Sequence, residues 1–183
     1  MGSWFQTIVD KNASIEEAET LANEIRDWLV ERGIIQAILT DCVLGGDGRG
    51  YPPGRNFEEA INPSTNHHFL HLWTNGLHLV IGRTIFDSGQ GDHFVMCPQC
   101  QTPHEVPTQW VDAISEWYEG KTAPLRCPRC NASTPITEWV FDPPWGFGNL
   151  GFTFWNWPPL KDKFVSEFGE RLKHQTVIVK GKL

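Results

Sequence analysis

The clearest pattern of apolar and polar positions along the chain predicts a helix near the N-terminus. Ser14 and Glu17 have the spacing of a capping box, in which each side chain bonds the backbone N–H of the other residue. From Ile15 to Leu29, apolar residues recur every three or four positions and so fall on one helical face. Gly33 supplies a C-terminal stop. We therefore expect an amphipathic helix between Ser14 and Gly33.

Runs rich in β-branched and aromatic residues flank this helix at 4–10 and 34–40. A strand, a helix and a second strand in this order predict a βαβ unit with two parallel strands. Residues 41–65 follow, and their many glycines and prolines predict a long loop with one helical turn near 57–61. Because the glycines match neither the P-loop nor the G-x-G-x-x-G pattern, a phosphate cradle is not favoured.

Residues 67–82 alternate between apolar and polar positions around Asn75-Gly76, which predicts a β-hairpin with a type I′ turn. A two-residue turn fixes the register and places the leucines on one face. Imidazoles on the other face could bind a catalytic zinc, although the hairpin carries no carboxylate base. The alternative is a polar surface that contacts a partner. The residues of this face are His67, His71, Trp73 and His78.

Two Cys-Pro-x-Cys corners lie in the middle of the chain with 26 residues between them. Each corner lets two thiolates of one tight turn face one cation, and two corners complete a tetrahedral all-thiolate site. The repeated proline favours a metal site over a redox dithiol, a pair of disulfides or four unrelated cysteines. The predicted ligands are Cys97, Cys100, Cys127 and Cys130.

These corners resemble the knuckles of the zinc-ribbon family, over about residues 93–136. The resemblance implies β-hairpins that end in rubredoxin-like knuckles and clasp one structural zinc per chain. Iron is the chemical alternative, because tetrahedral thiolate coordination suits both metals. A closed four-cysteine site has no open coordination position, so it stabilises a fold and does not activate water. The segment between the corners departs from a compact ribbon, since residues 108–120 have helical periodicity.

An aromatic segment, residues 139–157, follows the second corner. We expect most of its rings to build a core, and its prolines and glycines to make residues 142–151 a loop. Trp145 and Phe147 are then expected to protrude from this loop and to anchor a partner. An amphipathic helix over 159–175 and a C-terminal strand complete the chain.

The order of these elements predicts an α+β fold, in which helices cover one side of a mixed sheet and a zinc-ribbon module is inserted. Residues 1–88 would form the first part of the α+β domain, and residues 89–145 would form the insert with its helix. Residues 146–183 would return to the α+β domain, where the last strand is expected to join the first sheet.

The distribution of charge says more than the net value of −7. The predicted insert has three Lys and Arg residues against seven Asp and Glu residues, and a tetrathiolate around one dication adds further negative charge. An acidic ribbon is repelled by phosphate, so nucleic acid is not the favoured partner. Only residues 146–183 are basic, with six Lys and Arg residues against three Asp and Glu residues.

The sequence has no apolar run close to the length of about 18 residues that a membrane helix needs. Its N-terminal residues lack the basic start and the apolar stretch of a secretory signal. Metal-binding thiols and one further cysteine, Cys42, fit a reducing compartment. We therefore expect a cytoplasmic protein.

Together these features favour a zinc-binding protein that acts by binding another protein. A basic partner, which it would neutralise or regulate, fits the acidic charge. The acidic profile is similar in composition to that of bacterial immunity proteins, which neutralise toxins. The alternative is an enzyme that uses a metal on the His67, His71 and His78 face or uses Cys42. The sequence has no P-loop, HExxH or G-x-S-x-G motif to support an enzyme. The third candidate is nucleic-acid binding through the basic C-terminal helix.

Overall fold

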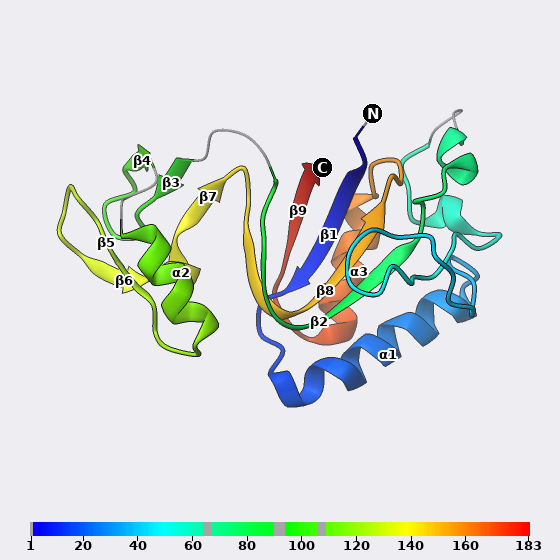
Figure 1. Ribbon diagram of the computed structural model, residues 1–183, viewed down its shortest axis with the longest axis horizontal. Helices are drawn as coiled ribbons and strands as arrows, with labels where there is room; N and C mark the ends of the chain where they lie inside the picture. Colours follow the sequence, from blue (N-terminus) through cyan, green and yellow to red (C-terminus); the bar gives the residue numbers. More distant parts are fainter. Residues whose placement is uncertain (1, 64–66, 90–93, 106–108) are drawn as a thin grey trace.

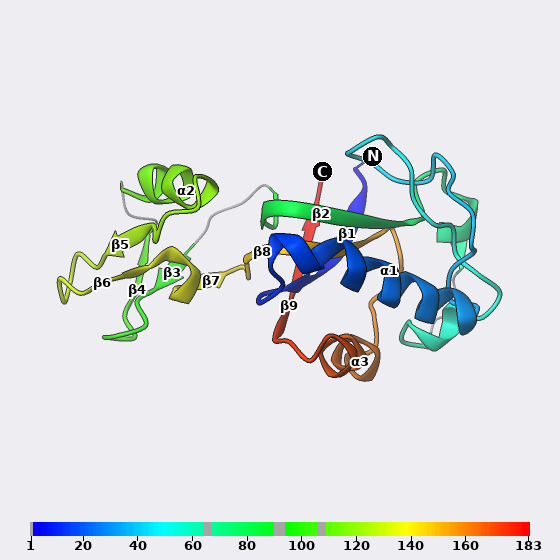
Figure 2. The same ribbon diagram turned by 90° about the horizontal axis from the view of Figure 1, so that it is seen from below.

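Two lobes with separate apolar cores make up the computed structural model (Figures 1 and 2). The main lobe holds a four-stranded sheet and two long helices. The cysteine lobe is the described part of residues 94–142, and it lies within the predicted insert. The structure describes residues 2–63, 67–89, 94–105 and 109–183.

The sheet of the main lobe confirms the α+β class, but it is antiparallel and not mixed. The last strand joins the first as expected, with Ile178 opposite Ile8. The cysteine lobe connects two neighbouring strands of this sheet, which pair up to Phe86 and Gly146. In spatial order the strands are β2 (Leu77–Phe86), β8 (Gly146–Trp155), β1 (Trp4–Asp10) and β9 (Thr176–Lys182).

The predicted βαβ unit is wrong. Residues 34–40 make isolated bridges, such as Ile35 with Pro53, and no strand. Both edges of β1 are already occupied by β8 and β9, so the sheet has no place for a parallel partner beside it. The apolar run instead supplies core residues, since Ile34 and Ile35 are buried in the main lobe.

Two helices, α1 (Ile15–Glu31) and α3 (Asp162–Leu172), pack on one face of the sheet. α1 begins with the predicted capping box, in which Ser14 makes both bonds with the first turn. The helices meet where the Trp28 ring stacks on Phe164 at 6.0 Å between centroids. Within the described ranges every helix is too short or too polar to span a bilayer. The sheet adds Ile8, Leu77, Leu150, Phe152 and Phe154 to this core.

The other face of the sheet is covered because the sheet bends back over it. A register shift in the middle of β2 bends the strand, and Phe86 packs with Val9 and Val179 in a small second core. Beyond β2, Gly89 forms a parallel bridge with Lys182 at the opposite edge of the sheet. The sheet therefore curls on itself, and its central strands are buried on both faces.

The predicted loop over residues 142–151 is wrong. Its glycines permit close packing between strands. Most of this stretch belongs to β8, the strand beside β1. A Cβ atom on Gly151 would lie 2.5 Å from the Phe86 ring, and one on Gly146 would lie 2.7 Å from Val9. Glycine in a strand marks such close approaches as well as turns.

The predicted hairpin of residues 67–82 is also wrong, because only its second half is a strand. Residues His68–His71 form a 3₁₀ helix, η2. The backbone N–H groups of Asn75 and Gly76 both donate to the Cys42 carbonyl oxygen, at 2.9 and 2.8 Å. A contact with a distant loop, and not a type I′ turn, therefore satisfies the backbone at this point.

The cysteine lobe is built from short elements around its own core. One three-stranded sheet has the order β4, β3 and β7, and a two-stranded sheet pairs β5 with β6. Its helix, α2, confirms the helix predicted between the cysteine corners. The bounds are β3 (Phe94–Met96), β4 (Pro103–Glu105), α2 (Trp110–Tyr118), β5 (Pro124–Arg126), β6 (Ser133–Pro135), η3 (Ile136–Glu138) and β7 (Val140–Asp142), with η1 (Phe57–Glu59) in the main lobe.

Gly151→Ala is expected to destabilise the main lobe, because the added methyl group meets the Phe86 ring. Overpacking of this kind costs about 1–3 kcal/mol, which urea unfolding measures. In a Phe86→Leu background the same change should cost less, because the shorter side chain leaves room. An equal cost in both backgrounds would contradict the packing of Phe86 on Gly151.

Candidate metal centre

Two backbone turns of the same form carry the four predicted cysteine ligands. In the first, the Gln101 N–H donates to the Cys97 carbonyl oxygen at 2.9 Å, and in the second the Asn131 N–H donates to the Cys127 carbonyl oxygen at 3.0 Å. Gln101 and Asn131 both adopt positive φ, at 51° and 58°. Each corner is thus a closed turn that aims two sulfur atoms at the same side.

Short antiparallel pairs hold the two corners in place. β3 runs into the first corner and β4 leaves it, with Met96 opposite Pro103. β5 and β6 do the same for the second corner, with Arg126 opposite Ser133. The strands therefore fix where each corner begins and ends, as the sequence predicts.

The four sulfur atoms form one cluster, in which all lie within 4.8 Å of one another. Sγ of Cys97 lies 3.8 Å from that of Cys130, and Sγ of Cys100 lies 3.7 Å from that of Cys127. A tetrahedral ion with metal–sulfur bonds of about 2.3 Å has sulfur–sulfur edges of about 3.8 Å. Disulfides need sulfur atoms about 2.05 Å apart, so the cysteines are spaced for a metal ion.

The cluster lies at the edge of the cysteine lobe core. Cys97 and Cys127 are buried, Cys100 is partly buried and Cys130 is exposed. His104 was not identified from the sequence, yet its Nε2 lies 3.4 Å from the Cys127 sulfur. Its position in β4, directly after the first corner, is the signal that could have indicated this contact. An imidazole N–H or a backbone N–H beside a thiolate stabilises its negative charge.

Hydrogen bonds also favour the thiolate at Cys100. The Thr102 hydroxyl donates to the Cys100 carbonyl oxygen at 3.3 Å. It also forms a hydrogen bond with the Cys100 thiol. Bonds from the side chain and the backbone of Thr102 lower the pKa of the Cys100 thiol to about 6. Since metals bind thiolates and not thiols, this shift favours metal binding at neutral pH.

The three histidines of the predicted catalytic face have three different environments. His78 is half-buried in β2, where burial lowers its pKa. His67 packs edge-on against Phe57 and lies 3.4 Å from Glu58. His71 is exposed in η2. Among the described residues, the four cysteines form the one group that brings three or more metal-ligating atoms together.

Cys42 has the environment of a packed side chain. It is buried with Val43 and Trp155, and Gly76 lies so close that a Cβ atom there would be 2.2 Å from the sulfur. Burial raises the pKa of the Cys42 thiol, which disfavours the nucleophilic thiolate. The structure therefore gives no support to Cys42 as a nucleophile.

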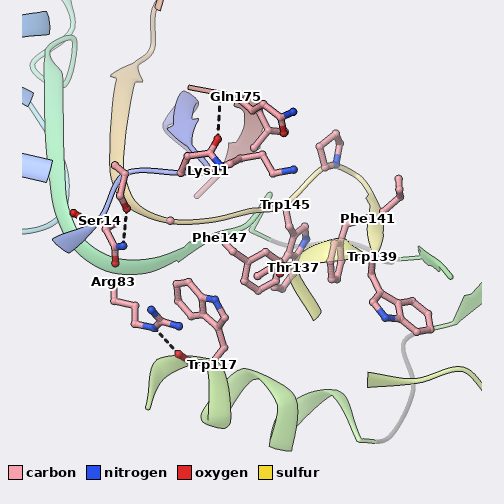
Figure 3. A pocket seen from close by; sticks show the side chains of 17 residues that line it. Lys11, Ser14, Arg83, Trp117, Thr137, Trp139, Phe141, Trp145, Phe147 and Gln175 are labelled. Carbon is pink, nitrogen blue, oxygen red and sulfur yellow. Dashed lines mark hydrogen bonds between the residues drawn. The ribbon is translucent and has the colours of Figure 1, made fainter. Parts of the chain in front are cut away.

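The three predicted aromatic anchors differ in exposure. Trp73 is 70% exposed. Phe147 is 7% exposed, so the prediction that it protrudes is wrong. Trp145 is partly buried, and its ring stacks on Phe141 at 5.4 Å between centroids. Trp145 and Phe147 instead help to line a cleft between the lobes (Figure 3).

Comparison with known proteins finds no relative. No protein-family model, no curated protein and no solved structure matches the chain. The function has to be inferred from the residues and their geometry.

The protein is expected to bind one metal ion per chain at the cysteine cluster. Cys97→Ser should lose the ion because it removes one of four thiolates, whereas Cys42→Ser, a control in the main lobe, should keep it. Elemental analysis of protein without a histidine tag measures both. A second ion per chain that His71→Ala or His78→Ala removes would contradict the single site.

Thr102→Val is expected to make metal release easier in acid. The Cys100 thiolate forms above a pKa of about 6, below the usual 9.0, and the folded site loses this advantage as the pH falls through 6. Without the hydroxyl this pKa should rise, so half-release to a chromophoric chelator should occur at higher pH. The exposed Thr122→Val, in the same lobe, should leave the midpoint unchanged. Equal midpoints for the two variants would refute the role of Thr102.

Proposed function

We propose that the chain is a zinc-stabilised protein that acts by binding another protein, of basic charge, through its cysteine lobe. The observation that carries this proposal is an open, apolar face on the β4–β3–β7 sheet. Neutralising a basic toxin, as bacterial immunity proteins do, is one form that this role would take. Thiols that must stay reduced to hold zinc favour the cytoplasm as the compartment.

One face of this small sheet packs on the core and the other lacks a cover among the described residues. Val95 and Phe141 point inward and are buried. On the outer face, Phe94 is 49% exposed and Val140 is 52% exposed, with Met96 partly exposed beside them. Large apolar side chains gathered on one open face are typical of a binding surface.

Acidic residues lie at one end of the same face. Glu105 and Asp142 are the register partners of Phe94 in the two neighbouring strands, so all three side chains share a face. Both carboxylates are exposed, and neither forms an ion pair within the described part of the chain. An apolar surface with free carboxylates at its rim suits a partner that offers an apolar residue next to Lys or Arg.

Zinc fits this role as a scaffold. Four thiolates around a divalent ion leave no position for substrate or water, so the ion would hold the lobe together. The lobe projects from the end of the main lobe, which makes its surfaces accessible to another protein (Figure 2). Iron would satisfy the same sulfur geometry, and elemental analysis separates the two metals.

Nucleic-acid binding is less well supported. Lys161 donates to the Glu58 carbonyl oxygen, and the Arg171 guanidinium lies over the Trp28 ring at 4.5 Å. Two of the basic groups that could meet phosphate are therefore engaged within the main lobe.

Replacing Phe94 and Val140 together by Asp is expected to abolish capture of the protein partner. The change puts charge at the centre of the apolar face, and bound partner should fall at least about tenfold. Tagged protein expressed in its source cells, followed by quantitative mass spectrometry, measures the loss. Glu105→Lys with Asp142→Lys should also weaken capture, because it reverses the rim charge.

The matched control is Val111→Asp, which adds a charge at a 63% exposed position of α2 away from this face. It should retain the partner, and all variants should retain the metal. Loss of the same protein from the control, or its retention by the Phe94 and Val140 variant, would refute the proposed surface.

A further inference from the structure

A cleft of about 750 Å³ lies where the cysteine lobe meets the main lobe (Figure 3). The main lobe contributes the turn between β1 and α1 and the ends of β2, β8 and β9. The cysteine lobe contributes α2, η3 and β7. Small-molecule sites commonly have volumes of about 300–1,000 Å³ and occur between domains, so the cleft has the size and position of one.

Aromatic rings form one wall of this cleft. Trp145 stacks on Phe141 with an angle of 21° between the rings. Phe147 meets Trp117 edge-on at 5.5 Å between centroids. Because each ring is held by another ring, the wall is rigid before any ligand arrives. Such a wall suits a flat apolar or aromatic group.

The charge of the cleft is opposite to that of the chain. Among the described residues that line it, Lys11 and Arg83 are charged and none is acidic, although the chain has a net charge of −7. The nearby Asp10 is fully buried and bonded to the Ala13 N–H and to His174, so its carboxylate is turned away.

The two cations are held differently. The Arg83 guanidinium lies 4.0 Å over the Trp117 ring and donates to the Trp117 carbonyl oxygen, so it is fixed to the wall (Figure 3). Lys11 is exposed and has no ion pair among the described residues. Its backbone N–H donates to the Gln175 carbonyl oxygen at 3.0 Å, which fixes the base of the side chain at the rim. An available ammonium group beside an aromatic wall suits an anion on a flat ring.

We infer that this cleft binds a small planar aromatic anion, whose ring lies against the Trp145 and Phe147 wall and whose carboxylate meets Lys11. Val140 and Phe141 line both the cleft and the β4–β3–β7 face, but the inference does not depend on the proposed protein partner, because its test changes Lys11, which lies outside that face. The carboxylate would gain a charge-assisted bond from Lys11, while the ring would leave water for an apolar surface. A neutral ring would gain only the burial of its apolar surface.

The test uses the metal-loaded full chain and two probes, naphthoate and its neutral analogue naphthamide, in isothermal titration calorimetry. Naphthoate should bind at one site, and Lys11→Met should weaken it about tenfold, the value of one charge-assisted bond. The affinity for naphthamide should not change in Lys11→Met. The exposed Lys163→Met on α3 is the matched control, and it should leave both affinities as they are.

Circular dichroism and metal content should be equal in all variants, so that a loss of affinity reports on the cleft and not on folding. Absence of saturable naphthoate binding by the unaltered protein would overturn the inference. Equal affinity for the two probes, or an equal loss in Lys11→Met and Lys163→Met, would overturn it as well.

Discussion

Four sulfur atoms that lie within 4.8 Å of one another are the constraint on which the cysteine lobe depends. Thiolates this close repel each other unless a cation lies between them. The strands around them are three residues long, and a lobe of this size buries too little apolar surface to be stable by packing alone. The open sheet face belongs to this lobe, and the aromatic wall of the cleft packs with its core. Their geometry therefore follows from the cluster, even though neither includes a ligand sulfur.

Two surfaces of opposite electrostatic character lie on and beside the cysteine lobe. On the outer face of β3, carboxylates at the rim favour cations, while the described residues that line the cleft between the lobes include Lys11 and Arg83 and no acid. A strongly acidic chain can hold a cationic cleft because its carboxylates are used elsewhere. Asp10 accepts a hydrogen bond from the Ala13 N–H and pairs with His174, and Glu17 takes part in the capping box of α1. Net charge alone would have missed this separation.

Local signals in the sequence predicted the elements that local interactions determine. The capping box and periodicity gave α1, the repeated Cys-Pro-x-Cys corners gave the four-cysteine cluster, and helical spacing gave α2. The failures lie where distant contacts decide. Asn75 and Gly76 bond to Cys42 and form no turn, and the glycines of β8 accommodate Phe86 and Val9 from other strands. The cleft could not be predicted, because Lys11 and Arg83 of the main lobe come to lie beside α2, η3 and β7 only when both lobes are folded.

The cysteine lobe joins two strands that are already neighbours, since the last residue of β2 pairs with the first residue of β8. Topologically, the lobe replaces the tip of a hairpin. A folded insert whose ends emerge side by side adds little closure entropy to the sheet that carries it. The main lobe can thus tolerate large changes at this point, provided that the two ends stay together. A different domain at this point would leave the pairing of β2 with β8 intact, so the surfaces on the lobe can change without a change in the sheet that supports them.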